Sequence, residues 1–146
     1  MAFENRLILP ENVTPVNYKL RLNPDLTKFN FCGEVSIKVT IKNPTHEIVL
    51  NSAELEIENV SVVAGQNEVN ISEFRLDEDT ETLHIITTDI FPAGDSNIDI
   101  RYKGELNDRL LGFYRSSYED QNGDQRFLAA TQFESTDARR AFPCWD

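Results

Sequence analysis

The chain has 146 residues, the size of one domain with a single core, and 40% of them are apolar, which excludes wholesale disorder. Its formal net charge is −11, and the stretch from Asn51 to Ile100 holds twelve Asp or Glu against one basic residue, Arg75. Because such an acidic surface repels phosphate backbones, nucleic-acid binding is not expected. The acidic stretch is interpreted as solvated surface.

Apolar and polar residues alternate with period two in the first half of the chain, which predicts half-buried β-strands. The apolar members of the first two strands are Tyr18, Leu20, Leu22, Val35, Ile37, Val39 and Ile41. Further on the parity shifts, because Leu55 and Ile57 occupy odd positions whereas Val60 and Val62 occupy even ones. A β-bulge near Asn59 would return both pairs to one face of the sheet.

The second half of the chain continues this pattern. Ile98, Ile100 and Tyr102 alternate with polar residues, and further strands are expected at residues 81–88, 112–118 and 126–134. The sequence Gln-Asn-Gly-Asp at 121–124 predicts a hairpin loop between the last two. No window of eleven residues has a helical period. The whole chain, residues 1–146, is therefore predicted to be one all-β domain of antiparallel sheets, packed as a β-sandwich or a curved saddle.

The residues that could carry metal or nucleophile chemistry are few. Cys32 and Cys144 form no Cys-x-x-Cys pair and are interpreted as buried or semi-buried free thiols, with one disulfide left open. A catalytic zinc needs about three protein ligands, whereas His46 and His84 lie on separate segments and are interpreted as surface or turn residues. We therefore expect neither a metal site nor a catalytic residue in this chain.

The first ten residues contain an early acidic residue and no apolar core run, so they are not expected to form a signal peptide. No apolar stretch approaches the roughly 20 residues that span a bilayer. A cytoplasmic location without membrane contact is predicted.

The end of the chain carries a distinctive string, TQFESTDARRAFPCWD, at residues 131–146. It resembles the signature that closes the amino-terminal domain of the zinc aminopeptidase family containing aminopeptidase N. The preceding GELNDRLLGFYRSSY is similar to the puromycin-sensitive members of that family. So is the opening LPENVTPVNYKLRLNPDL, which is followed by Phe31, Gly33 and a strand. The resemblance covers the whole chain and is densest at its end.

The resemblance implies a larger, zinc-dependent enzyme that releases amino-terminal residues from peptides. In the family, a thermolysin-like catalytic domain follows and supplies the zinc-binding His-Glu-x-x-His helix. The chain stops at Asp146, inside the signature, so we expect an amino-terminal domain that is cut before the catalytic domain, packs on it and is inactive alone. The implied partners are peptide substrates and that catalytic domain.

The resemblance also implies two substrate-binding residues. The carboxylate of Glu134 would bind the α-ammonium group of the peptide. Gln132, two residues earlier on the same side of a strand, would line the pocket for the first side chain, whereas Phe133 would point to the core. From the residues alone, Glu134 could instead form an ion pair with Arg139 or Arg140.

The remaining residues of the signature are expected to have structural roles. A network of charges and hydrogen bonds at the turn toward the next domain would be formed by Asp137, Arg139 and Arg140. We expect Phe142, Pro143 and Trp145 to pack in the interface with the next domain. In the isolated domain they would form an exposed apolar patch. Two functional alternatives stay open, a non-catalytic β-sandwich that binds proteins or glycans and an epoxide-hydrolysing member of the same superfamily.

Overall fold

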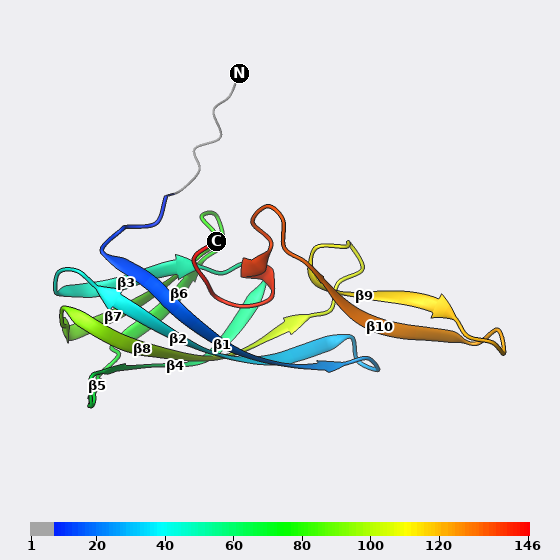
Figure 1. The fold of residues 1–146 in the computed structure, drawn as a ribbon, viewed down its shortest axis with the longest axis horizontal. Helices are drawn as coiled ribbons and strands as arrows, with labels where there is room; N and C mark the ends of the chain where they lie inside the picture. The colour runs from blue at the N-terminus through cyan, green and yellow to red at the C-terminus, as the bar shows by residue number, and fades with distance from the viewer. Residues whose placement is uncertain (1–7) are drawn as a thin grey trace, which may run out of the picture.

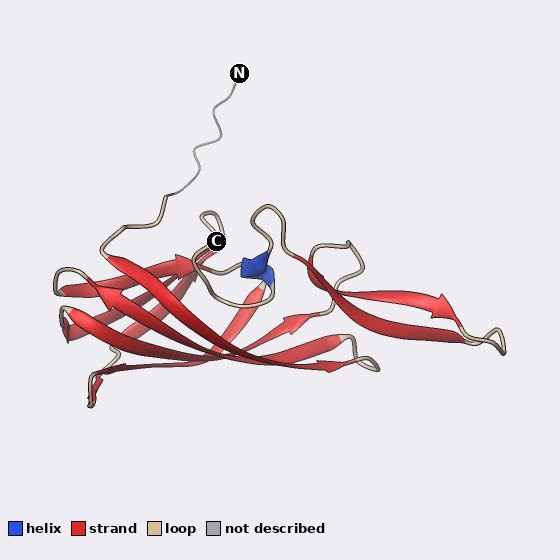
Figure 2. Ribbon diagram, in the orientation of Figure 1, coloured by secondary structure: helices blue, strands red, loops and turns tan. Residues whose placement is uncertain are grey.

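The computed structural model describes residues 8–146, whose regular structure is almost entirely antiparallel β-strand (Figures 1 and 2). The prediction about a signal peptide concerns residues 1–10, of which 1–7 lie outside the described residues. From residue 8 onward, no helix has the length and apolar character needed to cross a bilayer.

The strands of the described chain form three antiparallel sheets. In chain order they are β1 (Val13–Asp25), β2 (Asn30–Ile41), β3 (Thr45–Asn51), β4 (Leu55–Ala64), β5 (Asn67–Val69), β6 (Glu73–Asp77), β7 (Thr82–Phe91), β8 (Gly94–Glu105), β9 (Gly112–Glu119) and β10 (Gln125–Gln132). The sheet orders are β1-β2-β8-β4-β5, β3-β7-β6 and β9-β10. A short 3-10 helix, η1, covers Ala138–Arg140. The all-β prediction is confirmed.

The core lies between the five-stranded and the three-stranded sheets. Ile37 on β2 pairs with Ile98 on β8, which also pairs with Val62 on β4, and all three side chains are fully buried. The three-stranded sheet contributes equally buried residues to the same cluster, among them Ile48, Leu50, Leu83 and Ile85. The period-two pattern therefore has the cause that the sequence suggested, a sandwich with one apolar face on each sheet.

The predicted bulge is also present. The register between β4 and β8 shifts between Ile57 and Asn59. As a result Leu55, Val60 and Val62 are all buried although their positions differ in parity.

Three strands and one cysteine differ from expectation. The sequence did not predict β3, β5 and β6: the register of β3 shifts near its start, β5 has only three residues, and all of β6 is exposed. Cys32 is an exposed free thiol because it lies on the solvent face of β2, so its predicted burial is wrong. Cys144 is buried and free, and no disulfide joins the two.

Two glycines let aromatic rings lie against the backbone where β2 meets β8. Gly33 pairs with Tyr102, and Gly104 pairs with Phe31. A Cβ atom at either glycine would lie 2.3 Å from a carbon of the partner ring, so only glycine leaves room for these buried rings. Phe31 also contacts Phe113 of β9 edge-on, with ring centroids 4.9 Å apart, and so connects the sandwich to the hairpin.

Gly33→Ala is expected to lower the free energy of unfolding by about 1–3 kcal/mol, because the new methyl group overpacks against the ring of Tyr102. Urea denaturation measures the change. Lys38→Ala, on the solvent face of the same strand, is the control and should stay within about 0.5 kcal/mol of the parent chain. Equal stability of Gly33→Ala and the parent would show that the ring has room to move.

Candidate functional site

Strands β9 and β10 form a two-stranded hairpin that projects from the sandwich (Figure 1). The hairpin loop predicted at residues 121–124 is confirmed. Asp120 Oδ1 accepts hydrogen bonds from the backbone N–H groups of Asn122 and Asp124, at 2.9 and 3.0 Å. At the opposite end, Gln132 is the last residue of β10 and lies across from Gly112. This end of the hairpin meets the body of the domain.

Aromatic and cationic contacts hold the hairpin against the sandwich. The rings of Phe29 and Phe127 meet edge-on with centroids 4.8 Å apart. The guanidinium of Arg115 lies 4.4 Å from the ring centroid of Phe29 and donates a 2.6 Å hydrogen bond to the carbonyl of Leu106. The hairpin is therefore held against the sandwich along its length, at Arg115 in the middle of β9 and at Phe127 toward the tip.

Glu134 lies in the turn that follows β10. The turn is closed by a 2.9 Å hydrogen bond from the N–H of Asp137 to the carbonyl of Phe133. The last strand ends at Gln132, so the prediction that it extends to residue 134 is wrong. Because Glu134 lies beyond the strand, the alternation of side chains along a strand does not place Gln132 and Glu134 on one side. Phe133 is partly buried and contacts Phe142 edge-on, as expected of a core-facing residue.

The side chain of Glu134 is exposed and makes no hydrogen bond or ion pair within residues 8–146. The rival interpretation, an ion pair with Arg139 or Arg140, is wrong because other carboxylates occupy both guanidinium groups. Gln132 is exposed as well. The structure thus presents an exposed carboxylate at Glu134, two residues after the exposed amide of Gln132 at the end of β10.

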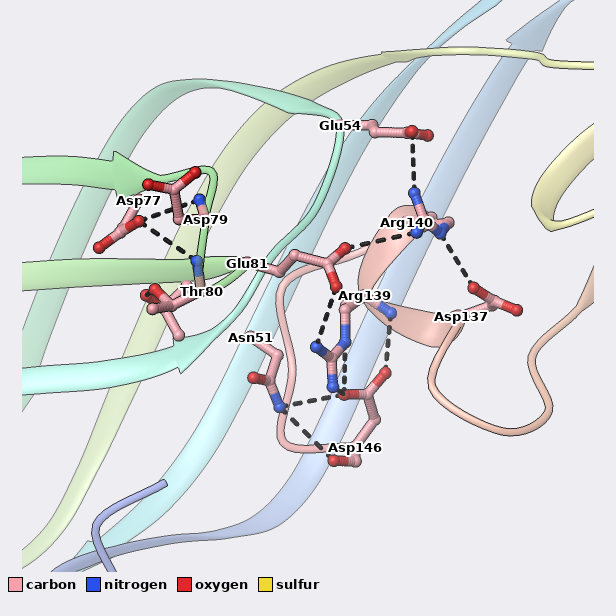
Figure 3. Close-up of polar contacts among 11 residues, drawn as sticks. Asn51, Glu54, Asp77, Asp79, Thr80, Glu81, Asp137, Arg139, Arg140 and Asp146 are labelled. Carbon is pink, nitrogen blue, oxygen red and sulfur yellow. Dashed lines mark hydrogen bonds and ion pairs between the residues drawn. The ribbon is translucent and has the colours of Figure 1, made fainter. Parts of the chain in front are cut away.

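Arg140 contacts three carboxylates (Figure 3). Its Nε donates to Asp137 Oδ1 at 2.9 Å. Its Nη1 lies 2.9 Å from Glu54 Oε1, and its Nη2 lies 3.3 Å from Glu81 Oε2. The predicted network of charges is confirmed, and it includes two glutamates that the sequence did not identify.

Arg139 ties the end of the chain to the same network (Figure 3). Its Nη2 and Nε contact Asp146 Oδ1 at 2.8 and 3.0 Å, and its Nη1 lies 3.6 Å from Glu81. Asn51 donates from Nδ2 to the same Asp146 oxygen at 3.0 Å and pairs through its backbone with Cys144. The last residues are thereby folded back onto the sandwich.

The charged state of this network follows from its contacts. Partial burial would by itself raise the pKa of Glu54, but the 2.6 Å hydrogen bond from Arg109 and the charge of Arg140 hold that pKa below its usual value. Partial burial would likewise lower the pKa of Arg140, but its carboxylate partners raise it. Both groups are therefore ionised at neutral pH.

The segment after η1 packs on its own domain, so the expected apolar patch is largely covered. Pro143 and Cys144 are buried, while Phe142 and Trp145 are half-buried. Phe142 contacts Tyr18 with ring centroids 5.8 Å apart, and the N–H of Trp145 donates to the Tyr18 hydroxyl at 3.0 Å. Burial raises the pKa of the Cys144 thiol, which suits a structural role better than a reactive one.

The described residues do not fit a zinc site. Within residues 8–146, no group of three or more His, Cys, Asp or Glu side chains could hold a metal ion. His46 is exposed, as expected of a surface residue. His84 is partly buried on β7, where its Nδ1 lies 2.5 Å from Glu47 Oε1 and its Nε2 lies 3.0 Å from Thr82 Oγ1. It is therefore not the surface or turn residue that was expected.

Gly112 is a further residue that the sequence did not single out. Its φ angle is +68°, and a Cβ atom there would lie 2.7 Å from Arg140 Cβ and 3.3 Å from the carbonyl oxygen of Asp137. Only glycine therefore allows the turn and η1 to approach the base of the hairpin this closely. Its place as the first residue of the expected strand 112–118 was the one available signal.

The model for the peptidase M1 N-terminal domain matches residues 14–146. The chain is 41% identical over 145 residues to aminopeptidase M1-D of Oryza sativa subsp. japonica, with 99% of the chain covered. It is 41% identical over 139 residues to puromycin-sensitive aminopeptidase of Caenorhabditis elegans, with 94% covered. It is 40% identical over 151 residues to "Aminopeptidase 2, mitochondrial" of Saccharomyces cerevisiae, with 97% covered. The chain spans 15–16% of the length of these relatives.

Gly112→Ala is expected to lower the free energy of unfolding by about 1–3 kcal/mol, because it combines backbone strain at positive φ with a clash against η1. Gly65→Ala is the matched control, since Gly65 has a φ of +63° but nothing within 4 Å of its added Cβ. Urea denaturation of both variants separates the clash from the strain. Equal losses would show that the close approach to Arg140 is unimportant.

The contribution of Glu54 to stability is expected to depend on pH. Because its pKa is lower in the folded state, the contribution is complete above the usual Glu pKa of about 4.3 and is lost as the pH falls through the folded value. The parent chain should therefore lose more stability than Glu54→Gln between about pH 5 and about pH 3. Urea denaturation across this range measures the difference, and parallel curves for the two proteins would contradict the prediction.

Proposed function

Because the chain belongs to the family of peptidase M1 N-terminal domains, we propose that it is the amino-terminal domain of a zinc-dependent aminopeptidase that releases amino-terminal residues from peptides. The zinc and the groups that activate water belong to a catalytic domain elsewhere in the protein, on which residues 1–146 pack. The domain alone is inactive in this proposal, and its contribution is substrate recognition.

The observation that carries this role is the unengaged carboxylate of Glu134. An aminopeptidase must recognise a free α-ammonium group, and a carboxylate does so through charge-assisted hydrogen bonds, each of which contributes about 1.5–3 kcal/mol. The nearby guanidinium groups of Arg139 and Arg140 do not neutralise Glu134, because they are bound to other acids. Glu134 therefore keeps its charge available for the substrate.

Gln132 is proposed to line the pocket for the first side chain and to help position the peptide backbone. Its amide is exposed at the last position of β10, opposite Gly112. An amide provides both a donor and an acceptor, which suits a peptide backbone whatever the side chain. The pairing of Gln132 with Gly112 across the hairpin holds the backbone from which this side chain extends.

Peptides are the proposed substrates, and the named relatives are all aminopeptidases, which favours this function over a non-catalytic interaction module or an epoxide hydrolase. The absence of nucleic-acid and membrane partners stays a prediction from charge and hydropathy. A cytoplasmic location stays a prediction as well, since the name of the yeast relative places that protein in the mitochondrion.

In the full-length enzyme, Glu134→Ala is expected to lower kcat/KM about thirty-fold for substrates with a free amino terminus, which corresponds to a lost contact of about 2 kcal/mol. Steady-state kinetics measures this change. Glu119→Ala, which removes an exposed acid at the far end of the same hairpin, is the matched control and should retain the parent kcat/KM.

A pair of competitive inhibitors separates amine recognition from a general loss of structure. Glu134→Ala should weaken the binding of the inhibitor that bears a free α-amine and leave the binding of its desamino analogue unchanged. Unchanged kinetics in Glu134→Ala, or equal weakening of both inhibitors, would refute the assignment.

A further inference from the structure

We propose that Arg140 is the residue that positions Glu134, by clamping the turn that carries Glu134 to the sandwich. The inference rests on the proposed function, because it concerns how the recognising carboxylate is held in place. Figure 3 shows the clamp, with Arg140 between Glu54, Glu81 and Asp137.

The partners of Arg140 come from three separate places in the fold. Asp137 belongs to the turn after β10, Glu54 lies between β3 and β4, and Glu81 lies between β6 and β7. One planar guanidinium group therefore joins the turn to both sheets of the sandwich. A guanidinium presents five donors in a rigid fork, so its contacts define direction as well as distance.

The connection from Arg140 to Glu134 is short. Asp137 closes the turn through its N–H, which donates to the carbonyl of Phe133, while its carboxylate accepts from Arg140 Nε, both at 2.9 Å. Glu134 lies inside this closed turn, and its exposed side chain makes no hydrogen bond or ion pair within residues 8–146. Its position therefore depends on the turn, and the side chain of Asp137 connects the turn to Arg140.

The backbone on the sandwich side is arranged toward the same guanidinium. Glu54 and Glu81 have φ angles of +59° and +53°, a region that residues other than glycine seldom adopt. Hydrogen bonds hold these neighbouring loops in place, from the N–H of Ser52 to the carbonyl of Glu81 at 2.9 Å and from the N–H of Ala53 to the carbonyl of Arg139 at 3.0 Å. Two glutamates in an uncommon conformation thus each place one carboxylate oxygen against Arg140, while their other oxygens contact Arg109 and Arg139.

Substitution by lysine isolates the proposed role, because it keeps the charge and removes the fork. In the full-length enzyme, Arg140→Lys is expected to lower kcat/KM roughly tenfold, since misplacing a recognising group lowers the rate even when the group itself is intact. The matched control is Arg126→Lys, which alters an Nε–carboxylate contact of the same length, 2.9 Å, to Asp120 at the hairpin tip. The control should keep the parent kcat/KM.

A double-mutant cycle shows whether Arg140 acts through Glu134. The effect of Arg140→Lys should shrink to less than twofold when Glu134 is already replaced by Ala. An undiminished loss in the Glu134→Ala background would overturn the proposal, since Arg140 would then act by another route. A merely structural role would lower Tm without producing this coupling.

Hydrogen exchange tests the clamp independently of activity. Measured by mass spectrometry on the full-length enzyme, Arg140→Lys should speed exchange in a peptide covering residues 133–137, whereas Arg126→Lys should not. Unchanged exchange in that peptide would overturn the positioning role. If Glu134→Ala leaves kcat/KM unchanged, the proposed function fails, while the exchange result still decides whether Arg140 holds the turn.

Discussion

The contacts of two adjacent arginines with acidic side chains hold the carboxyl-terminal segment of this domain against the sandwich. Arg140 and Arg139 lie side by side on η1, and each is at most one-fifth exposed at its side chain. Removing one partner from such a group leaves charges that are partly buried and unpaired, which is more destabilising than the net value of the pair suggests. The network therefore defines where the turn, η1 and the last residues lie relative to the sandwich.

The sandwich supplies the rigid support that such an arrangement needs. The buried rings of Phe31 and Tyr102 lie over glycines at the start of β2 and the end of β8, and Phe31 continues the packing to Phe113 at the start of β9. A recognising side chain is placed most accurately when its supporting residues are themselves fixed by packing. Gln132 ends a paired strand and Glu134 occupies a closed turn, so neither depends on a long loop.

The resemblance alone proposed Glu134 and Gln132 as binding residues, and the structure changed which partners the neighbouring charged residues have. Sequence reasoning alone left Glu134 with a credible partner in Arg139 or Arg140. The observed contacts give those arginines to Asp146, Glu81, Glu54 and Asp137 instead. The acids of the middle stretch, interpreted as solvated surface, include Glu54 and Glu81, which are structural partners of the final segment.

The sequence by itself determined the strands other than β3, β5 and β6, the bulge between Ile57 and Asn59, the hairpin loop at 121–124 and the family, because each depends on residues close together in the chain. Only the tertiary structure decided that Arg140 meets Glu81, 59 residues away, and that Asn51 meets Asp146, 95 residues away. It also decided that Gly112 lies beneath Arg140 and that the last strand stops at Gln132. Local periodicity reflects burial on one face of a strand, whereas the pairing of distant charges depends on how the sheets pack, which no local pattern encodes.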